Sequence, residues 1–379
     1  MLATTGWTAV HRPEAGVSPR AAALTVWTGA RFEGRSLPAA DAPARTVARF
    51  FAGLDGAQRA RLAEGHPLVV GNLDGAPVAT RYRANLLALR RAALAEEARG
   101  HDVALTPADR ATAVRRAHRF SSLAEPGRQI LAFDPSGGGL VAEVFGDVDE
   151  ARRISVIVPG VDTDAVTFER TQRRLTAPVG MAQSLYETER AADPAGRTAV
   201  IAWAGYAAPT GLGMDAATGR MAVDGAVRLK SLAAALPGDA SIALFCHSYG
   251  SVVCGVAAHE LPRRVTDLVV AGSPGMRAES VAELHTSARV WAARDEGDWI
   301  ADVPHLEVGG LGHGADPVSP GFGARLLSSA GARNHTGYFE PGTASLDNFA
   351  KIGTGAFGSV MCATGDGACR AGISGAERD

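Results

Sequence analysis

The chain of 379 residues has no run of about 20 consecutive apolar residues, the length that a helix needs to cross a bilayer. We therefore expect no membrane span. It also lacks an excess of either charge, because 38 basic and 40 acidic residues give a net charge of −2. Such a balance provides no field to attract nucleic acid or an anionic membrane, so we expect neither as a partner. With 46% hydrophobic and 21% charged residues, the composition excludes a mainly disordered chain.

Cysteine is scarce, since four residues are too few for a disulfide scaffold and their spacing matches no zinc site. We expect Cys246 and Cys254 to be buried thiols. Cys362 and Cys369 could close a small disulfide loop if the protein were exported. The stretch Met1–Arg20 lacks the basic segment and continuous apolar core of a signal peptide. The prediction is a cytoplasmic protein, with secretion as the alternative.

The chain divides into three parts. Pro43–His118 shows helical spacing of apolar residues and predicts a mainly helical accessory region within residues 1–120. Residues 121–362 alternate short β-branched runs with segments long enough for crossover helices, which predicts a doubly wound, mostly parallel α/β sheet. Residues 363–379 form a tail. The predicted strands are Ile130–Phe133, Leu140–Phe145, Ile154–Val158, Ala199–Trp203, Ile242–Phe245, Leu268–Ala271 and Val290–Ala293.

Ser248 stands between a predicted buried strand, Ser241–Phe245, and a predicted small-residue helix, Ser251–His259. A strand, a sharp turn at serine and a helix form a nucleophile elbow, in which the strained turn exposes the hydroxyl. The helix N-terminus then faces the developing negative charge. Position 246 holds Cys where the general pattern has Gly, and a small side chain meets the steric need there. The alternative is a serine that merely caps a helix.

A serine needs a base, and in elbow-containing enzymes the chain order is serine, acid, histidine. Five histidines follow Ser248. Two lie in predicted helical stretches, and two lie in or beside a Gly-rich loop whose place relative to the sheet is open. His335 lies in a late polar turn, so we predict it to be the base. The other four are His259, His285, His305 and His313.

The acid is expected in the loop that follows the strand Ala288–Ala293. We predict Asp298, because Trp299 and Ile300 beside it would re-enter the core and anchor it. Asp295, in the same loop, is the competing carboxylate and could simply belong to a solvated charge run.

Two further groups of residues lie at predicted strand ends. Pro159–Val161 follows one strand, and the backbone N–H of Val161 or a neighbour would join that of Tyr249 in an oxyanion hole. The alternative there is a plain Pro-Gly turn. Trp203 and Tyr206 end another strand and could line the substrate pocket, although aromatic residues at such positions are as often part of the core.

Several blocks along the chain also match a known pattern. They are Val70–Pro77 with Arg81, Ala84 and Asn85; Phe133–Pro135; Val158–Gly160; Ala202–Pro209; His247–Ser251; Gly272–Gly275; and His335 with Tyr338. In this order they resemble an actinobacterial α/β-hydrolase family catalogued as domain of unknown function 1023, from about Phe50 to Cys362. The resemblance implies the α/β-hydrolase fold and a triad of Ser248, Asp298 and His335, with no agreed substrate. Cys246 and Asn334 depart from the family pattern, which usually has Gly at both positions.

The expected function is hydrolysis of an ester, thioester or amide of a small-molecule acyl substrate through an acyl-serine intermediate. Such chemistry needs no metal and no organic cofactor. One alternative is an acyltransferase or cyclising enzyme that uses the same acyl-enzyme. Another is a non-catalytic binding protein on a hydrolase fold. The oligomeric state is not predicted.

Overall fold

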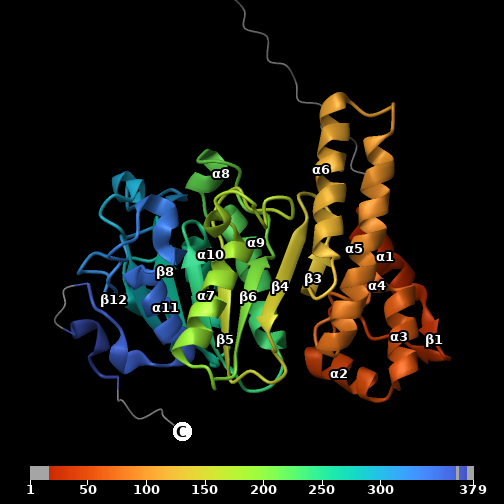
Figure 1. Cartoon of the computed structure of the whole chain (residues 1–379), viewed down its shortest axis with the longest axis horizontal. Coiled ribbons are helices and arrows are strands. Elements are labelled where there is room, and N and C mark those ends of the chain that lie inside the picture. Colours follow the sequence, from red (N-terminus) through yellow and green to blue (C-terminus); the bar gives the residue numbers. More distant parts are fainter. Residues whose placement is uncertain (1–16, 364–366, 374–379) are drawn as a thin grey trace, which may run out of the picture.

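The computed structural model describes residues 17–363 and 367–373 and is built around an eight-stranded sheet. The sheet lies between layers of helices (Figure 1). Its strands are β3 (Gln129–Asp134), β4 (Leu140–Gly146), β5 (Arg153–Val158), β6 (Thr198–Ala204), β7 (Ser241–His247), β8 (Val265–Ala271), β9 (Arg289–Ala293) and β12 (Arg325–Leu326). The order across the sheet is β12-β9-β8-β7-β5-β6-β4-β3, and β4 is the one strand that runs in the direction opposite to the other seven. The predicted mostly parallel sheet is therefore confirmed. The two-residue strand β12 was not predicted, because its sequence contains no apolar run.

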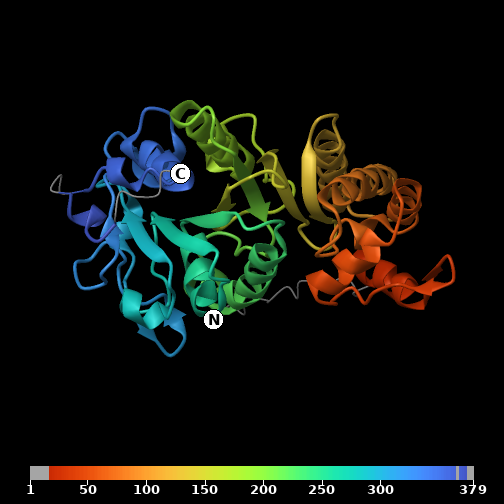
Figure 2. The ribbon, with the colours of Figure 1, turned by 90° about the horizontal axis from the view of Figure 1, so that it is seen from below.

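Helices cover both faces of the sheet, as expected for a doubly wound fold. Helices α7 (Pro178–Ala192) and α11 (Ala344–Thr354) pack on one face, and α9 (Arg220–Ala235) and α10 (Gly250–Ala257) on the other (Figure 2). Along β7, Phe245 belongs to the core on the α11 side and Leu244 to the core on the α10 side. Burial on both faces explains why the strands read as continuous apolar runs.

The residues that precede β3 in the chain form a helical region, which lies beside this edge strand (Figure 1). It has its own apolar core, which includes Trp27 and Phe51. The Asn72 side chain pairs with both backbone groups of Phe133 in β3, and Asn85 donates to the Ile130 carbonyl at 2.9 Å. These amides occupy backbone groups that an edge strand would otherwise expose. Its helices are α1 (Pro19–Gly29), α2 (Ala44–Ala52), α3 (Gly56–Gly65), α4 (Pro67–Val70), α5 (Val78–Gly100) and α6 (Pro107–Leu123).

Short elements complete the described part of the chain. The two-stranded ribbons are β1 (Arg31–Phe32) with β2 (Arg35–Ser36), and β10 (Glu307–Val308) with β11 (Leu311–Gly312). A short helix is α8 (Met214–Ala217), and the 3₁₀ turns are η1 (Arg174–Thr176), η2 (Ala258–Glu260), η3 (Val281–Leu284), η4 (Trp299–Asp302), η5 (Asn334–Phe339), η6 (Phe357–Ser359) and η7 (Ala368–Arg370).

Three sequence-based expectations concern the ends of the chain and its division. Most of Met1–Arg20 lies outside the described residues, as do parts of the predicted tail 363–379. Within the described residues, no helix combines the length and the apolarity that crossing a membrane requires. The proposed division at residue 120 stays a prediction, and α6 continues to Leu123 across it.

All four cysteines form disulfides, in the pairs Cys246–Cys254 and Cys362–Cys369. The expectation of buried thiols at Cys246 and Cys254 is therefore wrong as to their chemical state, although both residues are buried. The physical reason is the packing of α10 back on β7, which brings their Cα atoms to 6.5 Å. This separation is within the range that a disulfide bridges. The bond ties the strand that precedes Ser248 to the helix that follows it.

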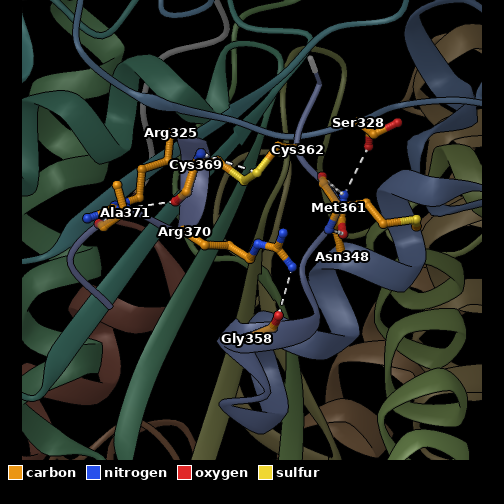
Figure 3. The surroundings of a disulfide bond; sticks show 9 residues. All are labelled: Arg325, Ser328, Asn348, Gly358, Met361, Cys362, Cys369, Arg370 and Ala371. Atoms are coloured by element: carbon orange, nitrogen blue, oxygen red, sulfur yellow. Dashed lines mark hydrogen bonds between the residues drawn. A yellow bond between two sulfur atoms is a disulfide. The ribbon is translucent and has the colours of Figure 1, made fainter. Parts of the chain in front are cut away.

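The second disulfide fastens the last described segment to the edge of the sheet (Figure 3). Arg325, in the edge strand β12, donates to the Cys369 carbonyl at 2.7 Å, and Arg370 donates to the Gly358 carbonyl at 2.9 Å. The backbone N–H of Cys369 points at the sulfur of Cys362. The small disulfide loop that the sequence allows between Cys362 and Cys369 is thus present in the structure.

Candidate active site

Ser248 occupies a sharp turn between β7 and α10. Its φ is 55°, a left-handed backbone conformation that a non-glycine residue adopts only at a cost. The Ser248 N–H donates to the Ala271 carbonyl in β8 at 3.0 Å, which holds the turn to the sheet. Gly250 lets α10 begin directly against β5, because a Cβ there would lie 2.1 Å from the Val158 carbonyl oxygen. This local structure is the one expected for a nucleophile elbow.

The structure brings Ser248, His335 and Asp298 into one hydrogen-bonded row. The His335 Nε2 atom lies 2.8 Å from Ser248 Oγ, and its Nδ1 atom lies 2.8 Å from Asp298 Oδ1. With the proton on Nδ1, the imidazole donates to the carboxylate and its Nε2 accepts the serine proton. Three loops that follow different strands supply these side chains, so the contact depends on the whole fold.

The Asp298 carboxylate is buried and saturated with hydrogen-bond donors. Besides His335, the Tyr338 hydroxyl donates to Oδ2 at 2.5 Å and the Ile300 N–H donates to Oδ1 at 2.9 Å. Burial opposes the charged form, but the hydrogen bonds from His335, Tyr338 and Ile300 outweigh it and lower the pKa of Asp298. The carboxylate is therefore held ionised and in a fixed orientation. The sequence places Tyr338 close to His335 but gives no signal of this contact with Asp298.

The competing carboxylate, Asp295, contacts backbone groups and not the His335 ring. Its Oδ2 atom accepts from the backbone N–H groups of Asn334 at 2.9 Å and Gly297 at 3.1 Å. Both contacts stabilise the two loops that meet at the site. Within the described part of the chain, the carboxylate that contacts the imidazole of His335 is that of Asp298.

Trp299 does not re-enter the core, contrary to the sequence-based expectation. Its side chain is 40% exposed, and its ring centroid lies 4.7 Å from that of His335. Only Ile300 turns inward, because the 3₁₀ turn η4 sends the two neighbouring side chains in different directions. The exposed indole therefore contacts the imidazole, and Ile300 alone provides the apolar anchor beside Asp298.

His247 supports the loop that carries His335. Its Nε2 atom lies 2.7 Å from the His335 carbonyl oxygen, so the neutral ring donates a proton there. Burial, reinforced by the nearby His335 ring, lowers the pKa of His247 to about 4. The ring is consequently neutral at physiological pH.

We expect acid to destabilise the protein through His247. An unfolded histidine has a pKa of about 6.5, so between that pH and about pH 4 the unfolded state binds the extra proton and stability falls as pH falls. His247→Gln, which keeps a donor without titrating, should reduce the loss of unfolding free energy between pH 7 and pH 4.5 by about 2 kcal/mol. Urea unfolding at both pH values measures this. The exposed His259→Gln variant is the control, and equal losses in both variants would contradict the assignment.

The loop after β5 lies directly against the serine. A Cβ added to Gly160 would lie 2.7 Å from the Cβ of Ser248 and 3.0 Å from its Oγ. Within the described residues, neither the Val161 nor the Tyr249 backbone N–H has a hydrogen-bond acceptor. The two predicted donors are thus free beside the serine, on the loop and at the start of α10.

The two aromatic residues predicted for the substrate pocket lie mainly in the core. Trp203 is 4% and Tyr206 is 1% exposed, and their rings stack with centroids 5.8 Å apart. The Tyr206 hydroxyl donates to the Pro159 carbonyl at 2.7 Å, which fixes the loop that carries Gly160 and Val161. Their contact with substrate stays a prediction.

Three of the other four histidines after Ser248 make the following contacts. His313 is buried and its Nε2 pairs with the Ala216 carbonyl, and His305 pairs with the Pro274 carbonyl. His259 is exposed beside Glu260. No group of three or more metal-ligating side chains occurs among the residues that the structure describes.

A family model described as alpha/beta hydrolase matches residues 134–308, which include β4 to β9, Ser248 and Asp298. This chain has the α/β-hydrolase fold. The match and the sheet order support the α/β-hydrolase superfamily. The narrower resemblance to domain of unknown function 1023 is not named by any of these matches and stays a prediction.

Two similar proteins are mycobacterial. The uncharacterized protein Rv2079 of Mycobacterium tuberculosis is 27% identical over 84% of this chain and 57% of its own length. The chain therefore spans little more than half of that relative. The uncharacterized protein Rv0963c of the same species is 35% identical over 45% of this chain and 66% of its own length.

Solved structures give only distant similarity. The 2,6-dihydroxy-pseudo-oxynicotine hydrolase has 13% identity and a TM-score of 0.28, covering 73% of this chain and 81% of its own. A protein of unknown function from Agrobacterium tumefaciens has 10% identity and a TM-score of 0.30, covering 46% and 72%.

Proposed function

We propose that this α/β-hydrolase cleaves an ester, thioester or amide through an acyl-Ser248 intermediate. The observation that carries the proposal is the hydrogen-bonded row from Ser248 through His335 to Asp298, with the serine in a left-handed turn. Such a turn costs of order 1–3 kcal/mol in backbone strain, and the surrounding structure must hold it. A binding protein would have no use for that strain, so the geometry favours the catalytic interpretation over the non-catalytic one.

Each proton has a place in this mechanism. Ser248 Oγ would attack the carbonyl carbon while its proton moves to His335 Nε2, and Asp298 would stabilise the resulting imidazolium. The tetrahedral intermediate would expel the alcohol, thiol or amine, which takes the proton from His335. A water molecule would then lose its proton to His335 and attack the acyl carbon, and that proton would return to Ser248 as the acid leaves.

The oxyanion would be held by the backbone N–H groups of Val161 and Tyr249. Free donors aimed at the developing charge typically provide the largest electrostatic contribution in acyl transfer. Tyr206 would act as a positioning residue, because its hydroxyl holds the Pro159 carbonyl at the start of the same loop.

A panel of acyl esters and thioesters of graded chain length tests the proposal. We expect the purified protein to hydrolyse at least one of them and Ser248→Ala to lose that activity, with His259→Gln as the control. An added alcohol or amine distinguishes the acyltransferase alternative, since an acyl transferase forms the new ester or amide at the expense of free acid. Equal turnover by the wild-type and Ser248→Ala proteins would refute the proposed mechanism.

The disulfides favour the secreted alternative over the predicted cytoplasmic location. Disulfides persist in oxidising compartments and are rare in the cytosol. We propose that the protein works in such a compartment, on the basis of the pairs Cys246–Cys254 and Cys362–Cys369. Thiol titration of the denatured protein, prepared from its native cells with thiols blocked at lysis, should find no free cysteine. Four free thiols would support the cytoplasmic location.

A further inference from the structure

A surface cavity of about 890 Å³ borders the loop that carries His335. Its lining includes Asn334 and Thr336, which flank the base in sequence, and residues 170, 171 and 173–176, with the 3₁₀ turn η1. His335 lies between these two residues in sequence, and its own side chain is directed at Ser248 and does not line the cavity. The cavity thus lies beside the loop of the proposed base and not at Ser248 itself.

Three arginines, Arg170, Arg173 and Arg174, line this cavity. Within the described residues none of them pairs with a carboxylate. Arg170 donates to the Thr176 hydroxyl at 3.3 Å and Arg174 to the Gln183 side-chain oxygen at 2.6 Å. These partners are neutral, so they orient the guanidinium groups without forming an ion pair.

The acidic residues nearby cancel only part of this positive charge. Glu169, next to the segment, pairs with Arg119 and Arg128 away from the cavity. Glu187 and Glu340 also line the cavity, and Glu187 accepts a hydrogen bond from Gln183. Three cations against two carboxylates leave an excess of one positive charge at the rim, in a protein whose net charge is −2.

The arginine segment is held in place by its backbone. Gly180, at the start of α7, packs on it so closely that a Cβ would lie 2.1 Å from the Arg174 carbonyl oxygen. Arg173 adopts a left-handed φ of 50°, and Asn334, which also lines the cavity, adopts one of 60°. Strained residues of this kind tend to cluster at ligand sites.

We propose that this cavity binds an anionic group of the substrate, a carboxylate, phosphate or sulfate placed away from the scissile bond. This inference rests on the proposed hydrolase function and adds to it a class of substrate. Arginine presents a planar set of donors that matches these oxyanions, and hydrogen bonds between charged partners are among the strongest in proteins.

Matched esters test the proposal kinetically. The p-nitrophenyl monoester of glutaric acid, which ends in a carboxylate, is compared with the neutral p-nitrophenyl valerate. We expect the wild-type protein to prefer the anionic ester by about tenfold in kcat/KM, and the preference to weaken as salt is added. Arg173→Ala and the triple variant R170A/R173A/R174A should lower that ratio, and Arg115→Ala on α6 is the control. Unchanged ratios in both variants would overturn the proposal.

Binding to the Ser248→Ala protein provides a readout that does not depend on turnover. Isothermal titration with glutarate monomethyl ester, butyl phosphate, butyl sulfate and the neutral methyl valerate compares the anions directly. We expect at least one anion to bind more tightly than the neutral ester, and about tenfold more weakly when Arg173→Ala is added. Anion binding without any hydrolysis would leave this inference standing and refute the proposed function. Hydrolysis with equal binding of charged and neutral esters would refute this inference and leave the proposed hydrolase function standing.

Discussion

Asp298→Asn is expected to reduce turnover by about 10⁴-fold, the effect seen when an orienting carboxylate becomes an amide and favours the wrong imidazole tautomer. The structure gives the reason, since Asp298 Oδ1 lies 2.8 Å from His335 Nδ1. The amide nitrogen of the variant would present a donor to a nitrogen that must itself donate. The measurement is kcat on any accepted ester, with folding checked by circular dichroism.

Asp295→Asn is the matched control, in the same loop and with the same change of charge. Its Oδ2 atom accepts only backbone N–H groups, from Gly297 and Asn334, and an amide oxygen can accept the same bonds. We expect turnover to stay within roughly tenfold of the wild-type value. If instead Asp295→Asn were the more damaging change, the acid would be Asp295.

Gly160→Ala is expected to lower kcat by about 10²- to 10³-fold, the range found when one oxyanion donor is lost. The added methyl would lie 2.7 Å from the Cβ of Ser248, so the loop must move away from the serine. That movement would carry the Val161 N–H out of reach of the oxyanion while leaving the Ser248, His335 and Asp298 side chains chemically intact.

Gly321→Ala is the control for this change. A Cβ at Gly321 meets no heavy atom within 4 Å, so the same substitution adds a methyl group without steric conflict. We expect its kcat to remain within about twofold of the wild-type value, as for other surface substitutions. Activity of Gly160→Ala near that of Gly321→Ala would show that the loop after β5 does not hold the oxyanion.

Much of the architecture could be predicted from local patterns. Strands buried on both faces read as continuous apolar runs, and all seven predicted strands are present. The loops that follow parallel strands meet at one edge of a sheet, and the site residues were predicted on that basis. In the structure Ser248, Asp298 and His335 do come together there.

The unpredicted features depend on how distant segments pack. Cys246 and Cys254 pair because α10 folds back on β7, a geometry that their spacing of eight residues does not reveal. Tyr338 reaches Asp298 from another loop, and its hydroxyl gives no signal of that in the sequence. Trp299 points outward because of the single turn η4. These are side-chain directions, which periodicity and motif order do not specify.

The most direct test of the central claim is labelling with a fluorophosphonate, which reacts only with an activated hydroxyl. Intact mass should show one adduct on the wild-type protein and none on Ser248→Ala, and peptide mapping should place the adduct on Ser248. An adduct on a different serine, or no adduct on folded wild-type protein, would contradict the assignment of Ser248 as the nucleophile.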